Sequence, residues 1–142
     1  MKTFVSIILS VCLTGITRAA PPDEDSRQLV QMPAMMQQHM LANMRDHLTA
    51  INEILTSMAH AQPETAAGIA ESRLGMSSLE RHGAAHMAAV MPEGMREAGT
   101  RMHRAASRFA LKAEAGETDA AWRALAEVTS ACVACHANYR VR

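Results

Sequence analysis

Two cysteines and a histidine lie close together near the end of this 142-residue chain, in the order Cys132-Val133-Ala134-Cys135-His136. On a helix, residues three and four positions apart share a face, so both thiols and the imidazole would project to one side. The pattern C-x-x-C-H is that of covalent c-type haem attachment, in which the imidazole binds the iron. We therefore expect one haem c, attached through Cys132 and Cys135, with His136 as the proximal iron ligand.

Two other kinds of site use a similar pair of cysteines. A redox dithiol is expected near a βαβ pattern, and no strand pattern precedes this pair. A zinc site needs two further ligands at similar spacing, and the third cysteine, Cys12, lies far away in an N-terminal apolar segment. Haem attachment therefore explains the motif better than either alternative.

The first 19 residues have the composition of a Sec-type secretory signal. Lys2 precedes a mostly apolar run over residues 4–16, and Thr17-Arg18-Ala19 offers small residues at the two positions that a signal peptidase reads. The run is shorter than the roughly 20 residues that span a membrane. We therefore expect cleavage after Ala19, a periplasmic location and no transmembrane anchor after processing. Acylation at Cys12 is a weaker alternative, because a bulky residue precedes it.

Removal of this signal would leave 123 residues, with twelve Lys and Arg against fourteen Asp and Glu. This balance offers no basic excess for binding nucleic acid or an anionic membrane surface. The length suits one domain with a single core. We expect residues 20–26 to be a flexible lead-in and residues 27–142 to form that domain.

Apolar spacing and helix-breaking residues predict four helices, over about residues 27–60, 64–90, 93–115 and 118–141. Gly68, Gly75 and Gly83 weaken the second of them. Short turns between four helices predict an all-α fold, an up-down-up-down antiparallel four-helix bundle. The haem would lie near the C-terminal end of the fourth helix.

Each helix should bury one face. In the first helix we expect an inward seam of Leu41, Met44, Leu48, Ile51, Leu55 and Met58. In the third we expect Met95, Met102, Ala106, Phe109 and Ala110 to point inward. The outer face of the third helix would be basic, formed by Arg96, Arg101, Arg104 and Arg108, and either solvated or a docking patch for an acidic redox partner. In the fourth we expect one stripe of Trp122, Leu125, Thr129, Cys132, His136 and Tyr139.

The topology predicts which side chains surround the haem. The end of the fourth helix would lie level with the start of the first, the end of the second and the start of the third. Seven methionines fall in those segments: Met35, Met36, Met40, Met44, Met87, Met91 and Met95. Most would be soft packing around the cofactor.

One of these methionines could bind the iron opposite His136. Met36, Met40 and Met44 are spaced by four and share a side of the first helix, with Met40 in the centre. His39 and His47 are the competing nitrogen ligands. We expect His39 at the surface and His47 at a flank.

The C-terminal motif resembles that of class II c-type cytochromes, the cytochrome c′ family. Cys132-x-x-Cys135-His136-x-x-Tyr139-Arg140 matches the family's C-x-x-C-H-x-x-Tyr/Phe-Arg/Lys. The rest of the mature chain agrees with the family in length and architecture but only loosely in sequence. The resemblance implies that Arg140 tunes the haem environment near the proximal histidine. It also implies dimerisation through the first two helices, which many family members show, so a homodimer is one expected oligomeric state.

The family has two branches. In the low-spin branch, a methionine of the first helix, a few positions before an Asn, completes six-coordination, and the protein carries electrons. Met40-Leu41-Ala42-Asn43 fits that pattern, which favours Met40 as the distal ligand, with Met44 or Met36 as alternatives. In cytochrome c′ proper, the iron is five-coordinate and binds small gases such as NO.

The sequence therefore predicts a periplasmic monohaem cytochrome that transfers one electron at a time to and from periplasmic redox proteins. No nucleophile–base set or paired carboxylates stand out, so we do not expect an enzyme. A five-coordinate gas-binding protein is one alternative. A periplasmic copper-binding protein is another, because His82 and His86 are spaced by four and His103 follows Met102.

Overall fold

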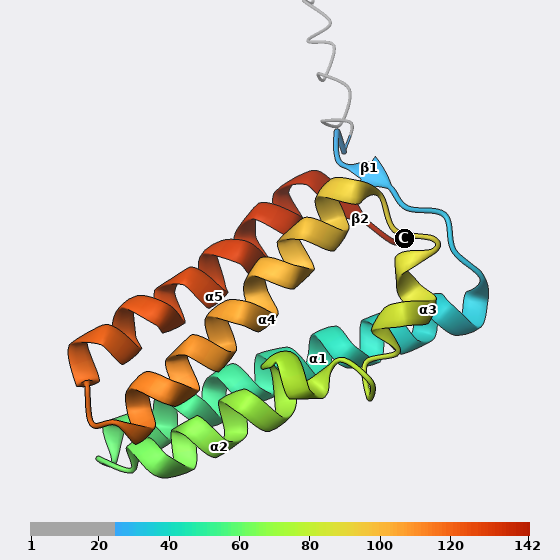
Figure 1. Cartoon of the computed structure of the whole chain (residues 1–142). Coiled ribbons are helices and arrows are strands. Elements are labelled where there is room, and N and C mark those ends of the chain that lie inside the picture. The colour runs from blue at the N-terminus through green and yellow to red at the C-terminus, as the bar shows by residue number, and fades with distance from the viewer. Residues whose placement is uncertain (1–24) are drawn as a thin grey trace, which may run out of the picture.

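The computed structural model describes residues 25–142 (Figure 1). The expected signal peptide, its cleavage site, Cys12 and residues 20–24 of the lead-in lie outside the described residues. Within residues 25–142, no helix is long and apolar enough to cross a membrane. In chain order the elements are β1 (Gln28–Leu29), α1 (Ala34–Ala59), α2 (Pro63–Arg73), the 3-10 helix η1 (Met76–Ser78), α3 (Ala84–Ala88), α4 (Glu93–Glu114), α5 (Thr118–Asn138) and β2 (Tyr139–Arg140).

The fold is all-α, built from helices that pack against one another. α1 packs on α2, α2 on α4 and α4 on α5. In Figure 1, the α1–α2 pair and the α4–α5 pair lie close together at the end that holds their connecting turns and diverge toward the end that holds the strands. The main core lies between the pairs, and its largest fully buried apolar side chains are Ile54, Leu74, Phe109 and Val128.

The second predicted helix is wrong as a single element, because the chain breaks into α2, η1 and α3. α2 does begin at Pro63, as a proline in the first helical position favours. α2 ends at Arg73, and Gly75 lies between α2 and η1 at a position where a side chain would collide with Glu71. Gly83 has a φ of 62°, in the left-handed region, so a helix cannot continue through it. Two of the three glycines that weakened the prediction, Gly75 and Gly83, thus lie where the helix is interrupted, whereas Gly68 lies within α2.

The first predicted helix begins later than expected, at Ala34, directly after Pro33. The preceding residues Gln28–Leu29 instead pair in parallel with Tyr139–Arg140. The backbone N–H of Val30 extends the pairing by donating to the carbonyl of Arg140 at 2.8 Å. The predictions missed these strands, because two-residue segments carry no periodicity.

Asp25 and Arg27 complete this N-terminal segment, residues 25–30. They form an ion pair of 2.7 Å, and the Asp25 carboxylate lies 3.5 Å from Nε of Arg140. The side-chain hydrogen bond from Arg27 lowers the pKa of Asp25 to about 2. Asp25 and Ser26, expected to be a flexible lead-in, therefore belong to a segment attached to the C-terminal end of the chain.

The fourth predicted helix ends earlier than expected. α5 stops at Asn138, where Tyr139 takes extended backbone angles and begins β2.

The third predicted helix matches α4 within one residue, and all five residues expected to point inward are buried. Its four arginines are exposed, as expected.

The inward faces predicted for α1 and α5 are both rotated from the observed ones. Leu48 and Leu55 are 73% and 44% exposed, and the side chains of Trp122, Thr129 and His136 are exposed as well. The buried residues of α1 are Met40, His47, Ala50, Ile54 and Ser57. Those of α5 are Ala121, Ala124, Leu125, Val128 and Ala131. Each observed face is rotated by about one residue, or roughly 100°, from the predicted one. The observed faces include small side chains such as Ala50, Ser57 and Ala121, which a choice of the largest apolar residues passes over.

Candidate functional site

The C-x-x-C-H motif lies in the last two turns of α5. Cys132 and Cys135 are half-buried, whereas Val133 and His136 are exposed. Helical geometry places Cys132, Cys135 and His136 within an arc of about 100°. Cys132 packs against the main core, and Cys135 packs against a separate apolar cluster. Both thiols therefore face the interior of the fold.

The second cluster is formed largely by methionines and is called the methionine cluster below. Its buried members are Val30, Met40, Met87 and Met95. The half-buried residues packed against it are Met32, Met36, Met44, Met91, Cys135, Tyr139 and Val141. Six of the seven methionines expected at this end are thus together with Cys135. Met35 is instead exposed, and Met32, which the sequence reasoning left out, joins the cluster.

The end of α5 is held in place by contacts from three other segments. Arg27 donates to the carbonyl of His136 at 3.4 Å, and Gln37 of α1 donates to the carbonyl of Val141. The Tyr139 hydroxyl lies only 2.5 Å from where a Cβ at Gly94 of α4 would be. The glycine at that position therefore allows the Tyr139 side chain to lie directly on α4.

The environment of the thiols argues against a redox dithiol. Burial raises the pKa of Cys132 and of Cys135, and the neighbouring Cys132 raises the pKa of Cys135 further. Reactive dithiols have a lowered pKa, because the thiolate is the nucleophile. Neither thiol therefore has the lowered pKa that a reactive dithiol requires.

Three histidines that are far apart in the sequence form a buried group, called the histidine cluster below. His47 of α1, His82 between η1 and α3, and His103 of α4 are 9%, 6% and 8% exposed. Their ring centroids lie 4.7 Å apart for His47 and His82, 5.5 Å for His82 and His103, and 6.1 Å for His47 and His103. The expectation that His47 is a flank residue is wrong. His39 is exposed, as expected, although its Nε2 lies 3.0 Å from the carbonyl of His82.

The histidine pair that suggested copper does not share a helix. α3 begins at Ala84, so His82 lies before it and is buried, whereas His86 lies within α3 and is exposed. The expectation that His82 and His86 form a pair at helical spacing is therefore wrong. The signal that could have identified His47 is its position seven residues from both Met40 and Ile54, on the buried face of α1.

The cluster holds its imidazoles in the neutral form. Burial lowers the pKa of His47 and of His82 to about 4 each, and the neighbouring histidines lower both further. Burial also lowers the pKa of His103. The nearest charged or titratable groups are Asp46 and His39 of α1, Arg73 of α2, and Arg81 beside His82.

Acidification should therefore destabilise the protein when no metal ion is bound. Between pH values of about 6.5 and 4, unfolded histidines bind protons that the folded cluster does not, so the free energy of unfolding falls as the pH falls. A shift of this size corresponds to about 3 kcal/mol for one histidine. We expect a loss of at least about that size, because the pKa values of two histidines are lowered to about 4. Urea unfolding in the presence of a chelator, at a series of pH values, measures it.

Carboxylates also titrate in acid, so a matched pair of variants is needed. In His47→Gln the fall between neutral pH and pH of about 4 should be smaller than in the wild type. His60→Gln, which alters an exposed histidine, should leave the fall unchanged. Equal pH dependence in both variants would contradict this prediction.

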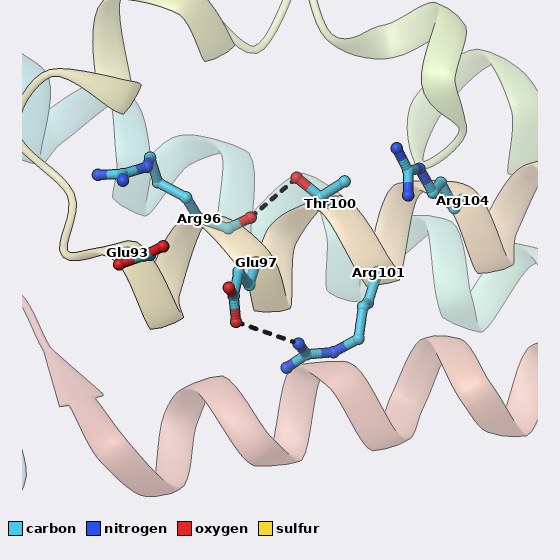
Figure 2. A pocket seen from close by; sticks show the side chains of 6 residues that line it. All are labelled: Glu93, Arg96, Glu97, Thr100, Arg101 and Arg104. Atoms are coloured by element: carbon cyan, nitrogen blue, oxygen red, sulfur yellow. Dashed lines mark hydrogen bonds and ion pairs between the residues drawn. The ribbon is translucent and has the colours of Figure 1, made fainter.

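The arginine face of α4 carries two shallow hollows. One, of about 340 Å³, is lined by Glu93, Arg96, Glu97, Thr100, Arg101 and Arg104 (Figure 2). A second, of about 470 Å³, shares Arg101 and Arg104 and extends to Ala131 and Ala134 of α5. Glu97 lies 3.8 Å from Arg101, and Glu127 pairs with Arg108. This interleaving of opposite charges is typical of a solvated face rather than of a surface that selects an acidic partner.

Comparison with models of known protein families, with curated proteins and with solved structures finds no match to this chain. The structure establishes a small, mostly helical domain. The proposal about function below rests on the C-x-x-C-H motif and the residues packed around it.

Proposed function

We propose that this protein is a periplasmic monohaem c-type cytochrome of the class II, four-helix-bundle type, which transfers single electrons between periplasmic redox proteins. The observation that carries the proposal is the packing of Cys135 in the same apolar cluster as Met40. These residues come from opposite ends of the sequence, one from the attachment motif and one from the segment expected to supply the distal ligand. Their meeting requires the tertiary fold.

The residues present fit a haem c. The two thiols face inward from α5, and every side chain of the methionine cluster is apolar, apart from the hydroxyl of Tyr139. Such a cluster favours burial of a flat apolar body such as a porphyrin, and flexible thioethers can rearrange around it. Cys132 and Cys135 would hold the haem covalently. His136, on the same arc of α5, would bind the iron, which requires the porphyrin to cover its exposed imidazole.

The bound haem would supply the one-electron chemistry, and the chain would set the conditions for it. Met40 is the buried candidate for the distal ligand, with Met44 and Met36 as half-buried alternatives in the same cluster. A thioether ligand raises the reduction potential relative to a second imidazole. Arg140 would add positive charge near the proximal side, where its Nε is buried without a well-aligned hydrogen bond among the described residues. The methionine cluster would exclude water.

Optical spectra of the purified oxidised and reduced protein test this proposal. We expect a low-spin, six-coordinate spectrum for the wild type. Met40→Leu should convert it to a high-spin spectrum and allow an external ligand such as CO to bind the reduced iron, because leucine offers no donor atom. Met35→Leu is the matched control, since Met35 is 83% exposed and should leave the spectrum unchanged.

Other spectra would contradict parts of the proposal separately. A five-coordinate, high-spin wild type would reject the Met40 assignment and favour the gas-binding alternative. A low-spin spectrum that survives Met40→Leu would transfer the ligand to Met44 or Met36, each testable by the same substitution. A colourless protein made with a functioning haem-attachment pathway would reject the cytochrome itself.

A further inference from the structure

The histidine cluster has no role in the proposed electron transfer, and it has the composition of a metal site. We infer that His47, His82 and His103 bind one divalent first-row transition ion, with Zn²⁺ as the reference case. Imidazole nitrogen is a preferred ligand for such ions. This inference goes beyond the haem proposal and does not depend on it.

The spacing of the three rings suits a shared ion. Zinc–nitrogen bonds are about 2.0–2.1 Å long. With each ring nitrogen roughly 1.2 Å from its centroid, three imidazoles around one zinc ion would have centroids about 5.2–5.6 Å apart in tetrahedral or trigonal geometry. Of the observed separations, 5.5 Å lies within that range, 4.7 Å lies below it and 6.1 Å lies above it. Small ring rotations would equalise them.

Those rotations are required, because no group of three or more His, Cys, Asp or Glu side chains in residues 25–142 could hold a metal ion in its present position. Nε2 of His47 and Nε2 of His82 are buried and have no hydrogen-bond partner among the described residues. A buried nitrogen without a partner costs free energy, and a bound cation would supply that partner.

The outer nitrogens of two rings are already held in the way that metal ligands require. Nδ1 of His103 lies 2.6 Å from the carbonyl of Leu74, which can only accept a hydrogen bond. The hydroxyl of Ser78 donates to the carbonyl of Gly75, so its oxygen accepts from Nδ1 of His82 at 3.3 Å. Both contacts place the proton on Nδ1 and leave the lone pair on Nε2. Metal-bound histidines are usually oriented by such contacts.

The charges around the cluster permit a cation. Arg73, whose positive charge acts on His47, is paired with Asp46 at 2.5 Å and with Glu53. Arg81 donates to the carbonyl of Ser72. Because the three imidazoles are neutral at pH 7, their lone pairs are available without loss of a proton. Three protein ligands would leave one position for water.

Zinc titration of the purified mature protein tests the inference. After treatment with a chelator and equilibration with Zn²⁺ alone, we expect one zinc per chain by elemental analysis, counted separately from iron. Zinc should also raise the melting temperature by several degrees, because it binds only the folded cluster. His47→Gln should weaken zinc binding on the order of 100-fold. His86→Gln, which removes the exposed histidine four residues from His82, should leave the affinity unchanged.

A measurement on the wild type removes any dependence on how well His47→Gln folds. The chain contains seven histidines. In nitrogen NMR spectra of the side chains, zinc should shift the Nε2 signals of three of them, and through-space contacts within the wild type should assign these three to His47, His82 and His103. Absence of stoichiometric zinc, equal weakening by His86→Gln, or shifts confined to exposed histidines would each overturn the inference. A colourless protein that binds zinc at this cluster would reject the haem proposal and leave the metal site standing.

Discussion

From the proposed haem attachment, replacing Cys132 and Cys135 together with serine is expected to yield a protein without covalently bound pigment. The haem would be joined to the chain by one thioether from each sulfur, and a serine hydroxyl does not form such a bond. Single replacements should leave one attachment point and yield less pigment than the wild type. Haem that stays with the chain after extraction with acidified organic solvent, quantified per chain, measures the result.

The matched control lies between the two cysteines. Val133 is 68% exposed, so Val133→Ser introduces the same hydroxyl into the same turn of α5 without removing a sulfur. We expect this variant to retain pigment at the level of the wild type. Pigment that resists extraction in the double cysteine variant would show that other residues attach it and would refute the assigned motif.

Replacing Leu74 with alanine should cause the largest loss of stability among the substitutions considered. The Leu74 side chain is 1% exposed and lies in the main core with Phe109 and Val128. Loss of a fully buried leucine removes transfer free energy and leaves a cavity, which together cost about 3 kcal/mol or more in the free energy of unfolding. That is a large part of the stability of a typical domain. Urea unfolding followed by circular dichroism at neutral pH measures it.

Leu111→Ala is the control for this experiment, because it makes the same chemical change on α4 at a side chain that is 66% exposed. We expect a change of less than about 0.5 kcal/mol. The carbonyl of Leu74, which accepts from His103, is unaffected by either substitution. Similar losses in the two variants would mean that the core described here does not carry the stability of the fold.

Patterns local in the sequence predicted a large part of the fold. α4 was predicted within one residue, because two clear breaks bound it and its buried residues recur with helical spacing. The predicted faces of α1 and α5 were rotated by one residue, because choosing the largest apolar side chains passed over Ala50, Ser57 and Ala121. Close helix packing selects small side chains at the contact, and a hydrophobicity pattern does not report contact distance.

The candidate functional residues were likewise predictable only in part from the sequence. The C-x-x-C-H motif was visible because its chemistry depends on residues within one helical turn. The histidine cluster was not visible, because His47 lies in α1, His82 lies 35 residues later in the turn before α3, and His103 lies another 21 residues on, in α4. Only the packing of those elements brings their rings within 6.1 Å of one another.

By itself the sequence determined the helical class, the turns that bound α4 and the presence of the C-x-x-C-H pattern, since each depends on backbone preferences or on neighbouring residues. The tertiary structure decided which sulfur meets which methionines, where the N-terminal segment pairs with β2, and which histidine accompanies His82. These depend on how helices rotate and approach when they bury their surfaces together. That outcome is a property of the whole packed chain, and no single segment encodes it.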